Sequence, residues 1–176
     1  MNIIVKPYGS DTCYCRPDTT WERENKDFYS PECVNEVYYA PVVFARVSKA
    51  GKCIGGKFVQ RYYDGIGCGV LLYGDGISHI DKSSILPQPL YDPIVFDDDK
   101  GFEINDTQIA QGEAGEWKRL LEETICRSSE LISLRIGDYV AVEVEPVKLL
   151  AGRADGEAVL KGKFCGNDIF DFKVIL

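Results

Sequence analysis

The sequence predicts a strand-rich α+β fold in a single domain over residues 1–176. Apolar runs of strand length recur along the chain, at residues 36–48, 70–73 and 139–145. Only residues 113–129 combine the length and the apolar spacing of a long amphipathic helix. Gly, Pro, Asn and Asp separate the apolar runs, as is typical of turns between strands. A chain of 176 residues is long enough to bury a core within one domain.

The formal net charge of −8 argues against two classes of partner. Nucleic-acid binding requires a basic surface, and anionic membranes attract basic segments, so neither partner is expected. The sequence contains no run of about 20 apolar residues that would span a membrane. Its first residues lack the features of a signal peptide. We therefore expect a cytoplasmic protein.

The first half of the chain predicts two strands with a short helix between them. Residues 36–48 form the first strand, and the spacing of the apolar residues in 54–63 indicates a short helix. Glycines 65, 67 and 69 then lead into the strand at 70–73, where we expect the backbone to pass close to its neighbours.

The second half predicts hairpins around the long helix. Residues 94–96 and 102–104 read as a hairpin across the acidic turn 97–101, and 107–109 follows a second turn. The helix at 113–129 has an apolar stripe of Trp117, Leu120, Leu121 and Ile125. Residues 139–145 alternate as a half-buried strand, and 158–164 pairs with 169–175 as a terminal hairpin.

Five short motifs occur in the same order as in the fumarylacetoacetate hydrolase family. They are Arg16-Pro17-Asp18, Arg46-Val47-Ser48, Gly51-Lys52-Cys53-Ile54, Arg61-Tyr62-Tyr63-Asp64 and Leu134-Arg135-Ile136-Gly137-Asp138. The chain resembles this family over most of residues 13–176, with a shortened middle section. The resemblance implies a mixed β-roll, and it implies enzymes that bind a divalent metal and often pair as homodimers.

The metal ligands of that family have no counterpart here. Placed by the flanking motifs, the two glutamates and the aspartate that usually bind the metal fall on Ala40, Val42 and Leu71. Hydrocarbon side chains offer no oxygen to a hard cation. We therefore expect no cofactor, and Mg²⁺ or Mn²⁺ only if another acidic site has replaced the lost one.

Candidates for such a rebuilt site are few. Glu143 and Glu145 lie on one face of the strand predicted at 139–145, about 7 Å apart. Paired carboxylates can perform acid–base chemistry, although the solvated face of an edge strand is the preferred interpretation. Asp64, Asp75 and the single histidine, His79, are weaker candidates. We favour an exposed or hydrogen-bonded structural histidine, and we read Asp97-Asp98-Asp99 as a solvated turn.

The seven cysteines have no Cys-x-x-Cys spacing. Buried free thiols in a reducing compartment are the favoured interpretation, and metal or disulfide chemistry the alternative.

Two hypotheses of function follow. The favoured one is a degenerate, non-catalytic protein that acts as a binding or partner subunit, as a homodimer or together with a catalytic relative. The alternative is a divergent hydrolase or isomerase of small oxo-acids, with an acidic metal site rebuilt from Glu143, Glu145, Asp64 or Asp75.

Overall fold

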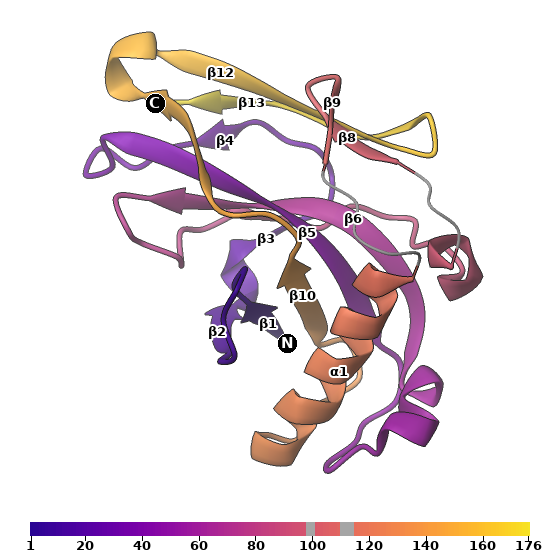
Figure 1. The fold of residues 1–176 in the computed structure, drawn as a ribbon. Helices are drawn as coiled ribbons and strands as arrows, with labels where there is room; N and C mark the ends of the chain where they lie inside the picture. Colours follow the sequence, from indigo (N-terminus) through magenta and orange to yellow (C-terminus); the bar gives the residue numbers. More distant parts are fainter. Residues whose placement is uncertain (98–100, 110–114) are drawn as a thin grey trace.

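In the described part of the chain, the fold consists of two β-sheets and one long helix (Figure 1). The computed structural model describes residues 1–97, 101–109 and 115–176. The larger sheet has eight strands in the order β2-β1-β10-β5-β6-β7-β3, with β11 also paired to β5. Its strands are β1 (Asn2–Lys6), β2 (Tyr14–Pro17), β3 (Trp21–Glu22), β5 (Glu36–Val47), β6 (Tyr63–Gly74), β7 (Ser84–Ile85), β10 (Tyr139–Glu143) and β11 (Lys148–Gly152).

The smaller sheet is built mainly from the C-terminal hairpin. Its order is β4-β13-β12-β8-β9, which corresponds to β4 (Phe28–Tyr29), β13 (Asn167–Ile175), β12 (Glu157–Phe164), β8 (Phe102–Ile104) and β9 (Thr107–Gln108). Strands β5 and β6 are the longest in the chain and lie at the centre of the larger sheet. The strand-rich α+β class predicted from the sequence is confirmed.

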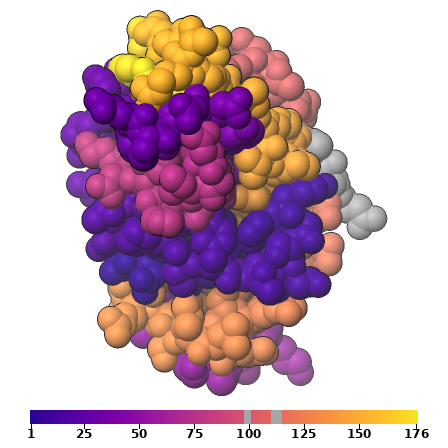
Figure 2. Space-filling view, turned by 90° about the vertical axis from the view of Figure 1, so that its left-hand side faces the viewer, coloured from indigo at the N-terminus to yellow at the C-terminus, as the bar shows by residue number. Residues whose placement is uncertain are grey.

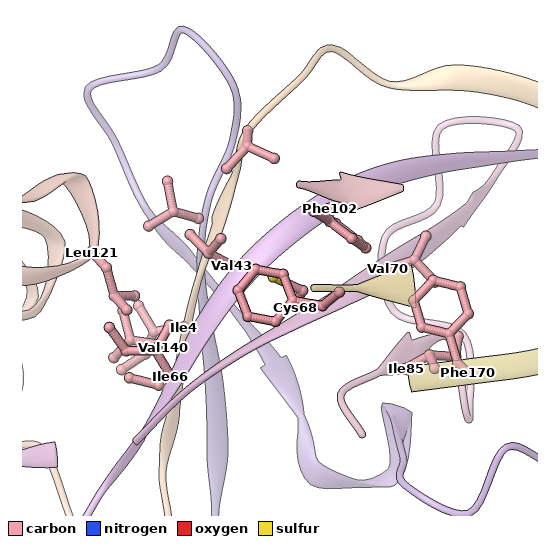
Figure 3. Close-up of a cluster of buried hydrophobic side chains, with 14 of the residues drawn as sticks. Ile4, Val43, Ile66, Cys68, Val70, Ile85, Phe102, Leu121, Val140 and Phe170 are labelled. Carbon is pink, nitrogen blue, oxygen red and sulfur yellow. The ribbon is translucent and has the colours of Figure 1, made fainter. Parts of the chain in front are cut away.

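The outer face of the larger sheet carries the main hydrophobic core. Alternate residues of β5, β6 and β10, among them Val43, Val70 and Val140, pack against the helix and the smaller sheet. Figure 3 shows Leu121 of the helix on one side of this cluster and Phe102 and Phe170 of the smaller sheet on the other. Burial of a side chain of this size contributes roughly 1.5–3 kcal/mol to folding, so this face joins the two sheets and the helix.

The opposite, inner face of the larger sheet has a second, separate core. It consists of Ile3, Val5, Val42, Phe44, Leu71, Leu86, Tyr139 and Ala141. A strand sends successive side chains to opposite faces, so β5 and β10 supply both cores in alternation. The larger sheet is therefore buried on both sides, which explains why β10 is buried at all five positions.

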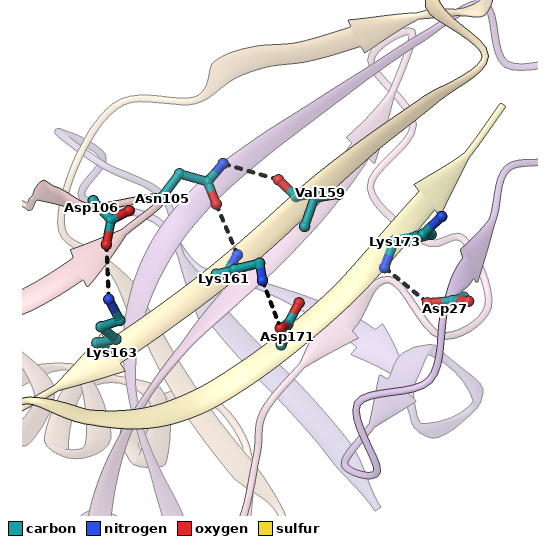
Figure 4. A network of polar contacts seen from close by, with 8 residues as sticks. All are labelled: Asp27, Asn105, Asp106, Val159, Lys161, Lys163, Asp171 and Lys173. Carbon is teal, nitrogen blue, oxygen red and sulfur yellow. Dashed lines mark hydrogen bonds and ion pairs between the residues drawn. The ribbon is translucent and has the colours of Figure 1, made fainter.

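The solvent face of the smaller sheet is held by polar contacts (Figure 4). Lys161 pairs with Asp171 at 3.0 Å, and Lys163 pairs with Asp106 at 2.8 Å. The side-chain amide of Asn105 donates to the carbonyl of Val159 at 2.9 Å. Exposed ion pairs of this kind add roughly 0–1 kcal/mol each, so this face confers solubility more than stability.

The helix prediction holds with shifted ends. Helix α1 covers Glu116–Leu131, while positions 113 and 114 lie outside the described residues. Leu121 and Ile125 are fully buried, and Trp117 and Leu120 pack against the core from partly buried positions. The shorter helix is only the 3₁₀ segment η2 (Gly56–Arg61), because strand β6 begins at Tyr63.

Two strand predictions need correction. Residues 93–96 form a 3₁₀ helix, η3 (Pro93–Phe96), and no strand, because Pro93 begins it and the side chain of Asp92 caps it. Of the acidic turn that was expected to follow, residues 98–100 lie outside the described part. Strand β10 is buried on both faces, because it lies between β1 and β5 and the sheet curls around it.

The expectation of seven buried thiols is also wrong in part. None of the seven cysteines forms a disulfide, but only Cys68 is buried. Among the described helices, none is both long and apolar enough to cross a membrane.

Truncation of the helix stripe will destabilise the fold. Leu121→Ala removes a fully buried side chain that α1 packs against the main core, so we expect the free energy of unfolding to fall by about 2–4 kcal/mol. Urea denaturation followed by circular dichroism measures the change. Arg119→Ala on the exposed face of the same helix is the control, with an expected loss below about 0.5 kcal/mol. Equal losses in the two variants would contradict the packing described here.

Strand β6 also depends on a glycine for its contact with β7. A Cβ atom at Gly69 would lie 2.3 Å from the carbonyl oxygen of Ile85, so Gly69→Ala must displace a strand backbone. We expect a loss of more than about 2 kcal/mol, in the range of strained core substitutions. Gly55→Ala is the matched control, since a Cβ atom added there would meet no heavy atom within 4 Å. A Gly69→Ala variant as stable as the Gly55→Ala variant would be the contradicting result.

Candidate functional site

The inner face of the larger sheet forms a roll that is nearly closed. The strand order begins with β2 and ends with β3, and the three-residue 3₁₀ turn η1 (Asp18–Thr20) joins these two edge strands in the sequence. The ends of the sheet are thereby brought together. Figure 2 shows the N-terminal residues, in indigo, across the middle of one face of the molecule. The N-terminal segment thus completes one wall of the roll.

Arg16 connects strands of the larger sheet across the inner face of the roll. Its side chain is fully buried, and its Nη1 donates to the carbonyl of Leu72 on β6 at 3.2 Å. The same nitrogen lies 3.1 Å from the hydroxyl of Ser83 and 3.3 Å from that of Ser84 on β7. The register pairs Arg16 with Ile3, so the guanidinium extends from β2 across the inner face to the far strands. One buried cation therefore connects the two ends of the sheet.

A chain of hydroxyl groups leads from Arg16 to a buried carboxylate. Arg16 Nε donates to the Tyr14 hydroxyl at 3.3 Å, and the hydroxyls of Tyr14 and Tyr73 are 2.8 Å apart. The Tyr73 hydroxyl in turn donates to Glu143. The other carboxylate oxygen of Glu143 accepts the backbone N–H of Tyr8 at 2.9 Å. The guanidinium also lies over the Tyr73 ring, 4.4 Å from its centroid, in cation–π geometry.

The prediction for Glu143 is therefore wrong. The sequence favours a solvated edge-strand glutamate, but the residue is only 4 % exposed and lies on a central strand. Its cross-strand partner on β5 is Val42, so its side chain faces into the roll. Glu145, expected on the same solvated face, is 8 % exposed and pairs with Lys148. Alternation along a strand does not reveal that the sheet curls. Because it curls, a face that the sequence suggests is solvated lies in the interior.

The positions that the family resemblance assigns to metal ligands do converge. Ala40 and Leu71 are direct cross-strand partners on β5 and β6, and Val42 is two residues from Ala40 on the same face. All three are fully buried. Val42 and Leu71 belong to the inner core, so hydrocarbon packing surrounds these positions. Across the described part of the chain, no three His, Cys, Asp or Glu residues are grouped as a metal site. These residues do not fit a divalent cation.

The remaining candidates are not brought together. Asp64 is exposed at the start of β6, whereas Asp75 lies just past its end, so strand geometry separates them by about 30 Å. Asp75 accepts the backbone N–H groups of Asn35 and Glu36 at 2.8 and 3.1 Å, and these bonds lower the pKa of its carboxyl group. His79 is exposed in the following loop. These contacts give Asp75 a structural role at a turn.

Sequence reasoning missed most of this cluster. Arg16 stands out in the sequence only as part of a motif, and nothing there singles out Tyr14, Tyr73, Ser83 or Ser84. One signal was present: Tyr14 and Arg16 are two residues apart, which places both on one face of a strand. Their partners on β6, β7 and β10 are far away in the sequence, so no local pattern could have identified the cluster.

This architecture, a curled mixed sheet packed on a smaller sheet and a helix, is the fold of the fumarylacetoacetate hydrolase family. Several solved structures share it at 13–16 % sequence identity, each aligned over 99 % of this chain. A protein named for this family from Yersinia pestis has a TM-score of 0.77 at 16 % identity, with 92 % of its own length covered.

Other similar structures carry the names of enzymes. Fumarylpyruvate hydrolase from Pseudomonas aeruginosa, solved with Mn²⁺ and pyruvate, has a TM-score of 0.76 at 16 % identity, with 88 % of its chain covered. 5-Carboxymethyl-2-hydroxymuconate delta-isomerase from Mycobacterium smegmatis has a TM-score of 0.77 at 13 % identity and 78 % coverage. The sequence matches no protein-family model, and no curated protein matches it. The likeness thus establishes the fold.

Burial of Tyr73 predicts a loss of stability at alkaline pH. Burial is the main cause that raises the pKa of its phenol far above the ordinary value of about 10. Below pH 10 both the folded and unfolded states keep the proton, so this contribution is complete. Above pH 10 only the unfolded state releases it, and the free energy of unfolding falls by up to about 1.4 kcal/mol per pH unit for this group.

Urea denaturation between pH 7 and pH 11, on wild type and Tyr73→Phe, tests this linkage. Tyr73→Phe removes one titrating phenol, so its stability curve should decline less steeply above pH 10. Between pH 7 and pH 9 the two curves should differ by a constant offset, which reflects the lost hydrogen bond to Glu143 and serves as the internal control. Parallel curves above pH 10 would show that Tyr73 does not contribute.

Proposed function

We propose that this chain is a non-catalytic protein with the fumarylacetoacetate hydrolase fold, acting as a binding or partner subunit. The observation that supports the proposal is that Ala40, Val42 and Leu71, the positions that the resemblance assigns to metal ligands, converge on the inner face as buried hydrocarbon. A metal-dependent reaction at this place needs a Lewis acid to polarise the substrate carbonyl, and these side chains cannot hold one. The proposal includes assembly as a homodimer or together with a catalytic relative.

If one ligand position lacked an oxygen, the other two could still hold a cation. Here all three positions lack one, and they lie in one packed layer. Val42 pairs with Gly69 on β6 and with Glu143 on β10, while Leu71 pairs with Ala40 and with Ser84. A cation placed between these residues would meet methyl groups and one carboxylate. A buried divalent ion with a single anionic ligand carries a large desolvation cost, and this geometry supports a site that no longer holds metal.

One observation favours the alternative, a divergent hydrolase or isomerase of small oxo-acids. Glu143 is a buried carboxylate in contact with a phenol, and the same hydrogen-bonded chain ends at the Arg16 cation. An acid–base group and a cation within one cluster are parts that such chemistry uses. Asp64 and Asp75, which the same hypothesis invokes, are too far apart to contribute together.

Metal titration separates the two functions. The chain, first treated with EDTA and then freed of it, is titrated with MnCl₂ and with MgCl₂ in a calorimeter, and fumarylpyruvate turnover is followed with and without metal. We expect neither saturable metal binding nor turnover. The Pseudomonas aeruginosa fumarylpyruvate hydrolase, whose structure contains Mn²⁺, is the positive control.

Stoichiometric Mn²⁺ binding that disappears in Glu143→Gln would overturn the non-catalytic proposal and support the alternative. Glu143→Gln preserves the shape of the side chain and a carbonyl acceptor for Tyr73, so loss of binding would report on charge. Glu123→Gln, on an exposed helix position, is the matched control for nonspecific carboxylate binding.

A further inference from the structure

Arg16 is a buried cation that lacks a direct counter-ion. Its side chain has no exposed surface, and none of the ion pairs among the described residues involves it. Its partners are the hydroxyls of Tyr14, Ser83 and Ser84 and two backbone carbonyls. Burial of a charge without a counter-ion is strongly unfavourable, so an anion beside the guanidinium would be stabilised.

The guanidinium also has unused donors. Nε and Nη1 are hydrogen-bonded, but the buried Nη2 has no hydrogen-bond partner in the described part of the chain. Buried N–H groups are almost always paired in folded proteins. The two hydrogens of Nη2 point in different directions, so this nitrogen can donate to one carboxylate oxygen, in a charge-assisted hydrogen bond that is stronger than one between neutral groups. The free donors therefore point to a small anion as the missing partner.

The location gives this feature a functional meaning. Ser84, which accepts from Arg16 Nη1, is the cross-strand partner of Leu71, one of the three positions where the resemblance placed a metal ligand. Arg16 also lies over the ring of Tyr73, two residues further along the same strand. A permanent organic cation thus lies beside the place that cannot hold a metal ion.

We propose that Arg16 is the centre of a metal-independent binding site for a small carboxylate inside the roll. The inference names a ligand class for the proposed binding function and rests on that function. Nη2 donates to the carboxylate, and the Ser84 hydroxyl and the hydroxyl chain of Tyr14 and Tyr73 hold the guanidinium in place. The two aromatic residues that contact Arg16, Tyr14 and Tyr73, are only partly buried, so a ligand would enter past them.

The buried position of Arg16 restricts the size of the ligand, because only a small anion can fit beside the enclosed guanidinium. Acetate is accordingly the probe, acetamide is its neutral isostere, and sodium chloride at matched ionic strength controls for general screening. Protein labelled with ¹⁵N is titrated in EDTA-containing buffer, and the Nε–H signal of Arg16 is followed together with the backbone amides of Leu72 and Ser84. We expect saturable shifts with a dissociation constant of about 1–10 mM for acetate, and none for acetamide.

Variants distinguish a binding role from a purely structural one. Arg16→Lys keeps the charge but loses the planar fork, so affinity for acetate should fall at least about tenfold. Arg46→Met removes an exposed arginine of β5 and should leave the titration unchanged. If Arg16→Lys does not fold, the wild-type titration against acetamide still decides the question, because it requires no substitution.

The outcomes separate the two proposals. A flat titration of the wild type, or equal shifts with acetate and acetamide, would overturn the carboxylate site while leaving the non-catalytic proposal intact. Saturable acetate binding in EDTA supports the site whatever the metal titration gives. Metal-dependent turnover would instead remove the non-catalytic proposal without affecting this readout.

Discussion

The contact on which the inner half of this protein depends is the hydrogen bonding of Arg16 across the roll. A curled sheet with two free edges would expose unpaired N–H and C=O groups at each edge. Here the edges are joined in sequence by a three-residue turn, and the guanidinium links β2 to β6 and β7 from inside. Without this cross-link, the inner core would be open along the side that the N-terminal segment covers.

Burial of an arginine is unfavourable unless its N–H donors are paired, which explains why the residues around Arg16 are polar. The hydroxyls of Ser83, Ser84 and Tyr14 and two backbone carbonyls satisfy most of its donors. Glu143 lies at the end of the same hydrogen-bonded chain, beyond Tyr73. Networks of this kind are stable when complete and costly when one member is missing. The fold therefore places polar groups in the same layer as Ala40, Val42 and Leu71, the hydrocarbon residues at the positions that the resemblance assigns to metal ligands.

The sequence was most informative where a local pattern and the final environment coincide. Leu121 and Ile125 are recognisable as a buried stripe because helical spacing alone places them on one face, and α1 uses that face. The terminal hairpin is also recognisable, because its two strands and its turn form a local pattern. The strand prediction for residues 94–96 was wrong, because an apolar tripeptide after a proline also suits a short helix.

The sequence by itself determined the strand-rich class, the long helix and the absence of oxygen ligands at Ala40, Val42 and Leu71, since these follow from local spacing and residue type. Only the tertiary structure decided that Glu143 faces an interior and that Arg16, Tyr14, Tyr73 and Glu143 form one cluster. The reason is physical: alternation along a strand assigns a residue to a face, but the curl of the whole sheet decides whether that face meets water or a second core.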